Sequence, residues 1–269
     1  MTKNLESAVY ETLRVERAAG HVLLVTMNRP DRANAQNTGM GEELLRVFES
    51  LYLDPGDVRC LVFTGAGQRF FSAGGDLKER NGMTEADWIR QHAVFEQMLR
   101  HIVNCPVPVI AAVNGIAYGG GCELALACDF AYASEHARFA LTEVTLGIIP
   151  GTGGTQNLAR ACGTRRAKEL ILTGSPFSAE EALSWGIVNG VKPGAELLPT
   201  CMAVAIRIAA NAPLAVRRAK QAIQRSPDLD LATGLAYELE AYYRLVGTQD
   251  RAEGVRAFVE KRAAVFKGC

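Results

Sequence analysis

The sequence predicts an α/β protein with mainly parallel strands, followed by a helical C-terminal region. Through about residue 195, short apolar segments of strand length alternate with longer segments of helical periodicity. Turns rich in glycine and proline separate them, and beyond residue 200 only helical patterns remain. A chain of 269 residues can bury a sizeable core. We therefore expect an α/β body over residues 1–195 and a helical region over 196–269.

The predicted elements of the body follow one another in a regular order. Residues 22–27 read as a buried strand that ends at the turn around Pro30, and a helix follows over about 38–52. Residues 59–64 form a second apolar strand, and a glycine-rich loop lies at 72–75. A helix over about 84–104 stops before Pro106, and residues 109–113 are a third strand.

The C-terminal region contains four predicted helices, at 197–211, 213–225, 230–246 and 250–266. The third has an apolar stripe at helical spacing. Such a stripe packs either inside its own subunit or against another subunit, and the pattern alone leaves both readings open. The stripe consists of Leu231, Leu235, Leu239 and Val246.

Composition and charge exclude several classes of protein. The 29 Lys and Arg residues balance 29 Asp and Glu residues, which argues against a nucleic acid or an acidic membrane as the main partner. No apolar run reaches the roughly 18 residues of a membrane span, and Glu6 and Glu11 interrupt any signal-peptide pattern. Seven scattered cysteines without a C-x-x-C pair suit a reducing compartment. We expect a cytoplasmic protein, or an organelle-matrix protein from which a transit peptide was removed.

Common site motifs are absent or incomplete. The loop G-T-G-G-T-Q at 151–156 lacks the last glycine of a dinucleotide fingerprint, and the sequence has neither a P-loop nor a G-x-S-x-G elbow. The four histidines have no metal-binding spacing, so no metal site is predicted. His92 and Glu96 lie one helical turn apart, and we interpret them as a solvated pair.

Two glycine-rich segments remain as candidate sites. Residues 70–80 (FFSAGGDLKER) follow a strand, and their small side chains let a ligand approach backbone N–H groups. In residues 114–129 (NGIAYGGGCELALACD), a strand leads through three glycines into a helix. N–H groups at such a helix start suit a developing oxyanion, although glycines also permit tight helix packing.

Two glutamates accompany these segments. Glu123 lies in the first turn of the predicted helix, where a carboxylate is commonly only a capping group. Glu143 lies in an apolar stretch over 140–151, where burial should raise its pKa as a proton-transfer group requires. Two carboxylates beside an oxyanion hole can perform acid–base chemistry next to a carbonyl that becomes an enolate.

The segments FSAGGDLKE, GGGCELALACD and TEVTLGIIPGTGGTQ together resemble the enoyl-CoA hydratase/isomerase (crotonase) superfamily. The resemblance extends over essentially the whole chain. It implies a spiral of ββα units followed by a helical trimerisation region, in a trimer or a dimer of trimers. It also implies an acyl-CoA thioester as substrate, with CoA part of the substrate and no separate cofactor.

The resemblance assigns roles to individual positions. The thioester oxygen is expected to accept hydrogen bonds from the backbone N–H groups of Gly75 and Gly120. The family's hydratases hold the attacking water between two glutamates that match Glu123, generally drawn as the base, and Glu143, generally drawn as the acid. The remaining matched substrate or CoA contacts are Ser72, Ala73, Asp76, Leu77 and Lys78, with Phe258 and Lys261 reaching from a neighbouring subunit.

The presence of both glutamates favours reversible syn hydration of a trans-2-enoyl-CoA to a 3-hydroxyacyl-CoA. Alternatives within the family are a hydratase of a branched acyl-CoA of the methylglutaconyl-CoA type, or another reaction such as enoyl-CoA isomerisation. A relative in that subgroup binds RNA, so a non-catalytic role is a further alternative. Gln36 departs from the family's usual apolar residue, and it is either a tolerated edge position or a substrate contact.

Overall fold

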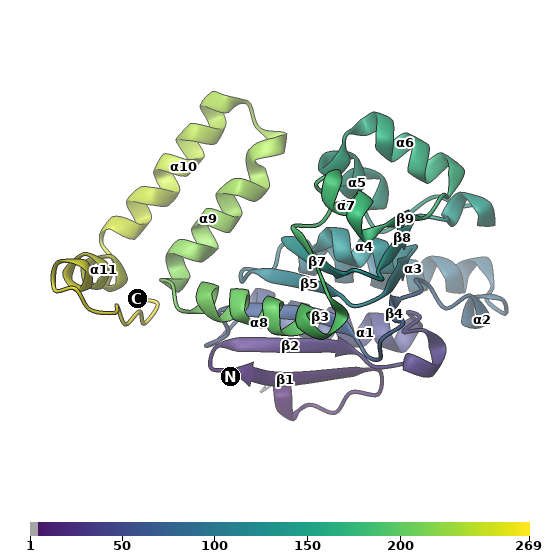
Figure 1. Ribbon diagram of the computed structural model, residues 1–269, viewed down its shortest axis with the longest axis horizontal. Coiled ribbons are helices and arrows are strands. Elements are labelled where there is room, and N and C mark those ends of the chain that lie inside the picture. The colour runs from purple at the N-terminus through teal and green to yellow at the C-terminus, as the bar shows by residue number, and fades with distance from the viewer. Residues whose placement is uncertain (1–4) are drawn as a thin grey trace.

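A six-stranded sheet forms the centre of the computed structural model, which describes residues 5–269 (Figure 1). Its strand order is β1-β2-β3-β5-β7-β10, and all neighbours are parallel except β1 and β2. The three predicted strands are confirmed to within one residue, whereas the antiparallel β1 was not predicted. The strands are β1 Leu13–Ala19, β2 Val22–Met27, β3 Cys60–Gly65, β5 Val109–Val113, β7 Phe130–Ser134 and β10 Gly190–Lys192.

A second sheet has the order β4-β6-β8-β9, and it consists of very short strands. Strands β3, β5 and β7 of the large sheet each continue into a strand of the small sheet, so the chain winds as a spiral. This confirms the predicted α/β class and the repeating ββα order. The strands are β4 Phe70–Ser72, β6 Ile116–Tyr118, β8 Arg138–Ala140 and β9 Phe177–Ser178.

Helices follow the spiral turns and bury apolar side chains in one core with residues of both sheets. The predicted helix at 38–52 is α1 (Thr38–Leu53), and the predicted helix at 84–104 is α3 (Glu85–Val103). Thr84 begins α3 with a reciprocal capping box, which satisfies backbone donors at the helix start. The other body helices are α2 Leu77–Arg80, α4 Gly120–Ala127, α5 Gly154–Cys162, α6 Thr164–Thr173 and α7 Ala179–Ser184. Short 3-10 turns are η1 Leu5–Ser7, η2 Pro30–Arg32, η3 Glu143–Leu146 and η4 Ser226–Asp228.

The other face of the large sheet is covered by α8 (Gly194–Ala209), although this helix falls in the expected C-terminal region. Its buried Leu197, Cys201 and Ala205 pack on Val62 and Ile110 of the sheet. Both faces of the parallel strands are therefore shielded from water, as continuous apolar strands require.

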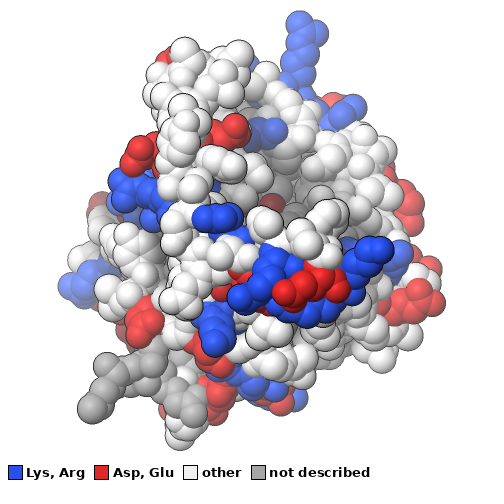
Figure 2. Space-filling model, turned by 90° about the vertical axis from the view of Figure 1, so that its left-hand side faces the viewer, with Lys and Arg blue, Asp and Glu red and all other residues white. Residues whose placement is uncertain are grey.

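The last three helices form an arm that projects from the body (Figure 1). They are α9 Pro213–Arg225, α10 Leu231–Val246 and α11 Gln249–Val259. The arm leaves apolar side chains exposed within this chain, including Leu231, Leu235 and Leu239 of the predicted stripe. Figure 2 shows this side of the molecule, where charged groups of both signs lie among wide uncharged areas.

The predicted final helix at 250–266 is too long, because α11 ends at Val259. Lys261 adopts a left-handed backbone conformation (φ 54°), which stops helical propagation. The chain then turns back, and the backbone N–H groups of Lys267 and Gly268 donate to the buried carboxylate of Asp250. This tertiary contact outweighs the helical periodicity of the segment.

Among the described residues, no single helix is long and apolar enough to cross a membrane. The consecutive helices α8 and α9, taken together to Asp228, meet the length and composition criteria only as a pair bent by 110°.

Candidate active site

A cavity of about 530 Å³ lies where α2, α3 and the start of α4 meet the loops after β8. It brings together both glycine-rich segments and both predicted glutamates, although these are separated by up to 70 residues in the sequence. Its wall is mainly apolar, with a few polar groups. The lining residues are Gln36, Ala73, Gly75, Leu77, Arg80, Trp88, His92, Phe95, Gly119, Gly120, Glu123, Thr142, Glu143, Leu146, Ile148, Ile149, Gly151 and Thr152.

The two glycine-rich segments touch each other at Gly74. Its φ of 88° lies in the left-handed region, and an added Cβ would lie 2.7 Å from the Tyr118 carbonyl oxygen and 3.0 Å from the Gly120 nitrogen. Only glycine allows this approach. The backbone N–H groups of Gly75 and Gly120 have no protein acceptor within residues 5–269. Two free donors on the same cavity wall can therefore stabilise negative charge on one ligand oxygen.

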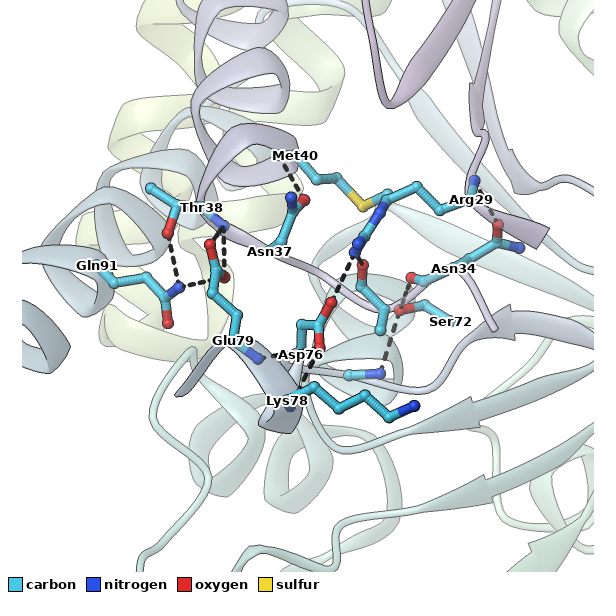
Figure 3. Close-up of polar contacts among 12 residues, drawn as sticks. Arg29, Asn34, Asn37, Thr38, Met40, Ser72, Asp76, Lys78, Glu79 and Gln91 are labelled. Atoms are coloured by element: carbon cyan, nitrogen blue, oxygen red, sulfur yellow. Dashed lines mark hydrogen bonds and ion pairs between the residues drawn. The ribbon is translucent and has the colours of Figure 1, made fainter. Parts of the chain in front are cut away.

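A network of polar side chains holds the segment that carries Gly75 (Figure 3). Asp76 caps α2 by accepting hydrogen bonds from the N–H groups of Lys78 and Glu79, and it forms an ion pair of 3.0 Å with Arg29. These hydrogen bonds and the Arg29 charge lower the pKa of Asp76 even though its partial burial acts in the opposite direction. The residue expected to contact substrate therefore uses its carboxylate to hold the loop.

Ser72 belongs to the same network and is fully buried. Its hydroxyl donates to the Asn34 carbonyl oxygen at 2.8 Å and accepts from the Gly74 N–H group. It also accepts a hydrogen bond of 3.2 Å from the side chain of Gln36. The Ser72 side chain therefore stabilises the turn. The expected contact of Ser72 with CoA stays a prediction, and it would have to use the Ser72 backbone because the hydroxyl is already hydrogen-bonded.

Gln36 is almost completely buried and lines the cavity, so it is not an exposed edge position. Its backbone forms a parallel bridge with Gly75, and its carbonyl oxygen accepts from the Asp76 N–H group at 2.9 Å. An added Cβ on Gly120 would lie 3.2 Å from the Gln36 side-chain oxygen. The side chain therefore fills the space between the two glycine-rich segments.

Glu123 is buried in the first turn of α4, with 3% of its surface exposed. It accepts hydrogen bonds of 2.8 Å from the backbone N–H groups of Thr152 and Gly154. The Thr152 hydroxyl donates to its second oxygen. Three donors from the loop at 152–154 thus fix the orientation of this carboxylate at the cavity wall, which goes beyond simple helix capping.

Glu143 begins η3 and faces the same cavity, with 8% of its surface exposed. Burial raises its pKa to about 7, and the negative charge of Glu123 acts in the same direction. One of its carboxylate oxygens, Oε2, is buried without a hydrogen-bond partner in the described part of the chain. A carboxyl group that titrates near neutrality can exchange a proton with a bound reactant.

The other predicted contacts lie in different environments. Ala73 and Leu77 line the cavity, and Lys78 is exposed, with its side chain directed away from the polar network (Figure 3). Phe258 is 85% exposed on α11, and Lys261 follows that helix. Since α11 and α2 lie at opposite sides of the molecule (Figure 1), one chain does not bring Phe258 or Lys261 to the cavity.

Sequence reasoning missed three contributors to the cavity. Thr152 lies in the loop at 151–156, which the sequence analysis compared only with the dinucleotide-binding motif. A hydroxyl side chain among the glycines of this loop is the signal that could have indicated a hydrogen-bond donor. Arg80 ends the first glycine-rich segment, and its positive charge in a mainly apolar wall was not predicted. The predicted pair of His92 and Glu96 is wrong: His92 lines the cavity, while Glu96 forms an ion pair with Arg100 on the outer face of α3.

Within residues 5–269, no group of three or more histidine, cysteine, aspartate or glutamate side chains is arranged to hold a metal ion. The polar groups of the cavity include two backbone donors and two carboxyl groups, together with the side chains of Gln36, Arg80 and His92. This set can stabilise an oxyanion and transfer protons on the same bound molecule.

Comparison with known proteins gives consistent similarities. The model of the family described as enoyl-CoA hydratase/isomerase matches residues 17–269. A putative enoyl-CoA hydratase/isomerase of Bacillus subtilis is 45% identical over 248 residues, which cover 92% of this chain and 95% of that protein. The short-chain-enoyl-CoA hydratase of Clostridium acetobutylicum is 42% identical, covering 90% and 93%. The crystal structure of enoyl-CoA hydratase from Bacillus anthracis has a TM-score of 0.94 at 44% identity, covering 96% of this chain and all of that one.

Proposed function

Since the chain belongs to the enoyl-CoA hydratase/isomerase family and is a hydratase within it, we propose that it catalyses reversible syn hydration of a trans-2-enoyl-CoA. The product is the 3-hydroxyacyl-CoA. The observation that carries this proposal is the pair of buried carboxyl groups in one cavity with two unpaired backbone donors. No separate cofactor takes part, because water and the thioester supply all the atoms that react.

The oxyanion step uses Gly75 and Gly120. In hydration, the oxygen of water bonds to C3, and the C2=C3 electron pair moves toward the thioester, whose oxygen becomes negatively charged. The two N–H groups would donate to that oxygen, and such donors typically contribute about 3 kcal/mol each to transition-state stabilisation. Because a side chain at position 74 would push the two glycine-rich segments apart, Gly74 helps to position the N–H groups of both Gly75 and Gly120.

The proton transfers use the two glutamates. Glu123, oriented by three donors, would accept the proton of water as its oxygen bonds to C3. Glu143, whose pKa of about 7 keeps a sizeable protonated fraction at neutral pH, would deliver a proton to C2 of the enolate. In the dehydration direction the two roles reverse.

A crotonyl-CoA assay tests the proposed reaction directly. The loss of enoyl absorbance is followed with the wild-type protein and with Glu123→Gln, which keeps the shape of the side chain but is not a base. We expect the variant to lose about 10²- to 10⁴-fold in kcat. Exposed Glu49 provides the control, since Glu49→Gln should leave the rate unchanged. Equal rates for the wild type and Glu123→Gln would refute the assignment.

We also propose that the arm assembles the protein into a trimer or a dimer of trimers. The exposed apolar side chains of α10 and α11 support this, including Leu235, Leu239 and Phe258. Assembly would let Phe258 and Lys261 approach the CoA of a neighbouring subunit. Sedimentation velocity distinguishes these assemblies from a monomer, and a Leu239→Glu variant that sediments like the wild type would contradict the interface.

A further inference from the structure

Gln36 is a buried polar side chain that lines the cavity between the two proposed oxyanion donors. Its backbone forms a parallel bridge with Gly75. Its side-chain amide lies against Gly120, where an added Cβ would be 3.2 Å from Oε1 and 3.4 Å from Nε2. A ligand oxygen bound by the N–H groups of both glycines would therefore lie beside the Gln36 amide.

The hydrogen bonds of Ser72 fix the orientation of this amide. The Ser72 hydroxyl donates its single proton to the Asn34 carbonyl oxygen at 2.8 Å, so it can only accept from its other neighbours. One of these neighbours is the Nε2 group of Gln36, at 3.2 Å. Nε2 is therefore the end of the amide that faces Ser72, and Oε1 is the end that remains for the cavity.

The Oε1 atom of Gln36 accepts no hydrogen bond from any group within residues 5–269. It is an amide acceptor at the surface of a mainly apolar cavity. A ligand that fills the cavity shields Oε1 from solvent, and an acceptor that loses water without gaining a donor lowers the affinity. A well-matched ligand therefore presents a hydrogen-bond donor at this point.

The thioester oxygen is not that partner, because it is itself an acceptor and its two lone pairs face Gly75 and Gly120. A CoA thioester carries a donor close by, namely the amide N–H group of the cysteamine unit, three bonds from the sulfur. Oε1 of Gln36 lies within about 6 Å of the Gly120 nitrogen, since that nitrogen and an added Cβ are bonded to the same carbon. The cysteamine unit can bridge a span of this length.

We propose that Gln36 binds the CoA part of the substrate by accepting a hydrogen bond at Oε1 from the cysteamine amide N–H group. This contact holds the thioester at a third point, next to the two backbone donors. The amide N–H group does not change during hydration, so the contact is equally strong in the bound substrate and in the transition state and acts on KM. This inference rests on the proposed position of the thioester oxygen between Gly75 and Gly120.

Two other roles of Gln36 predict different results. A second Nε2 proton donated to the thioester oxygen would stabilise the enolate, and its loss would lower kcat for every substrate. A purely structural role, in which the amide only holds Ser72 and the turn, would also affect all substrates to the same extent. Only the proposed contact depends on whether the substrate has the amide N–H group, so two substrates that differ in this group separate the roles.

The matched substrates are crotonyl-CoA and an analogue in which a CH₂ group replaces the cysteamine amide N–H group. We expect the wild type to hydrate the analogue with a kcat/KM about 10-fold lower, mainly through KM, which is the range of one buried hydrogen bond. Gln36→Leu should hydrate both substrates with the same kcat/KM. Gln36→Glu keeps an acceptor oxygen and should keep most of the preference, and Gln97→Leu, at an exposed position of α3, should behave as the wild type.

Binding of saturated thioesters gives a readout that does not depend on hydration. Calorimetry with butanoyl-CoA and its CH₂ analogue should show about 10-fold tighter binding of butanoyl-CoA by the wild type and no difference for Gln36→Leu. Equal affinities and equal kcat/KM values within the wild-type pairs would overturn the contact and leave hydration intact. A preference for the amide that persists in Gln36→Leu would also overturn it, because another group then binds the N–H. A preference in binding that requires Gln36, without turnover of any enoyl-CoA, would support the contact and refute only the proposed hydration.

Discussion

Replacing Glu143 by glutamine should stabilise the folded protein at alkaline pH while it removes most of the activity. The ordinary pKa of 4.5 rises to about 7 in the folded protein because burial disfavours the charged form. Between these two values the folded state binds more protons than the unfolded state. The free energy of unfolding therefore falls as the pH rises from 4.5 to 7, and the loss is complete above pH 7.

The size of this loss follows from the two pKa values. Each pKa unit corresponds to about 1.4 kcal/mol, so ionised Glu143 costs the folded state about 3 kcal/mol at pH 8 and about 1 kcal/mol at pH 5. Glutamine has the same shape and no charge to bury. Relative to the wild type, Glu143→Gln should therefore gain about 2 kcal/mol more in unfolding free energy at pH 8 than at pH 5.

Urea unfolding at pH 5 and pH 8, at one fixed protein concentration, measures this difference. Glu49→Gln is the matched control, because Glu49 is exposed and its replacement should change the unfolding free energy little at either pH. The crotonyl-CoA assay on the same preparations should show a loss of about 10²- to 10⁴-fold in kcat for Glu143→Gln. A stability difference between Glu143→Gln and the wild type that is the same at both pH values would refute the reasoning.

Three further changes test other parts of the structure. Gly74→Ala forces a Cβ against the backbone of the second glycine-rich segment, so kcat on crotonyl-CoA should fall by about 10²-fold or more while circular dichroism still shows a folded protein. Thr152→Val removes one charged hydrogen bond to the Glu123 carboxylate, and we expect about 10- to 100-fold lower kcat, whereas Thr155→Val, at a half-buried position of α5 whose hydroxyl accepts from the Gln156 side chain, should keep the wild-type rate. Lys220→Met removes the 2.7 Å partner of Asp129, whose side chain is 24% exposed, and this should lower the unfolding free energy in urea by about 1 kcal/mol; an unchanged midpoint would show that this pair does not tie α9 to the body.

Local patterns carried most of the fold prediction. Strands β2, β3 and β5 consist of continuous apolar residues, and α1 and α3 have one apolar face, so each element could be recognised from its own residues. The short strands of the second sheet were not predicted. With two or three residues each, they have no periodicity of their own, and they form only because the spiral places them side by side.

The residues of the candidate site also fall into two groups: those that the sequence predicts, and those whose role only the tertiary structure reveals. Glycine content and an acidic residue in an apolar stretch are visible in the sequence, and these features pointed to the two glycine-rich segments, Glu123 and Glu143. The family resemblance then selected Gly75 and Gly120 within those segments. The structural roles of Ser72 and Asp76 were not visible, because their partners come from distant parts of the chain. Only the fold shows that these two side chains hold the loop.

The sequence by itself determined the α/β class, the two glycine-rich turns and the identity of the two carboxyl groups. Each of these depends on residue types and spacing over a few neighbouring positions. The tertiary structure alone decided what surrounds those groups: three donors on Glu123, a buried Glu143 with one carboxylate oxygen unpaired within residues 5–269, and the Arg80 charge in the cavity wall. Burial and hydrogen-bond partners set the charge and orientation of a side chain, and both arise only when segments far apart in the sequence pack together.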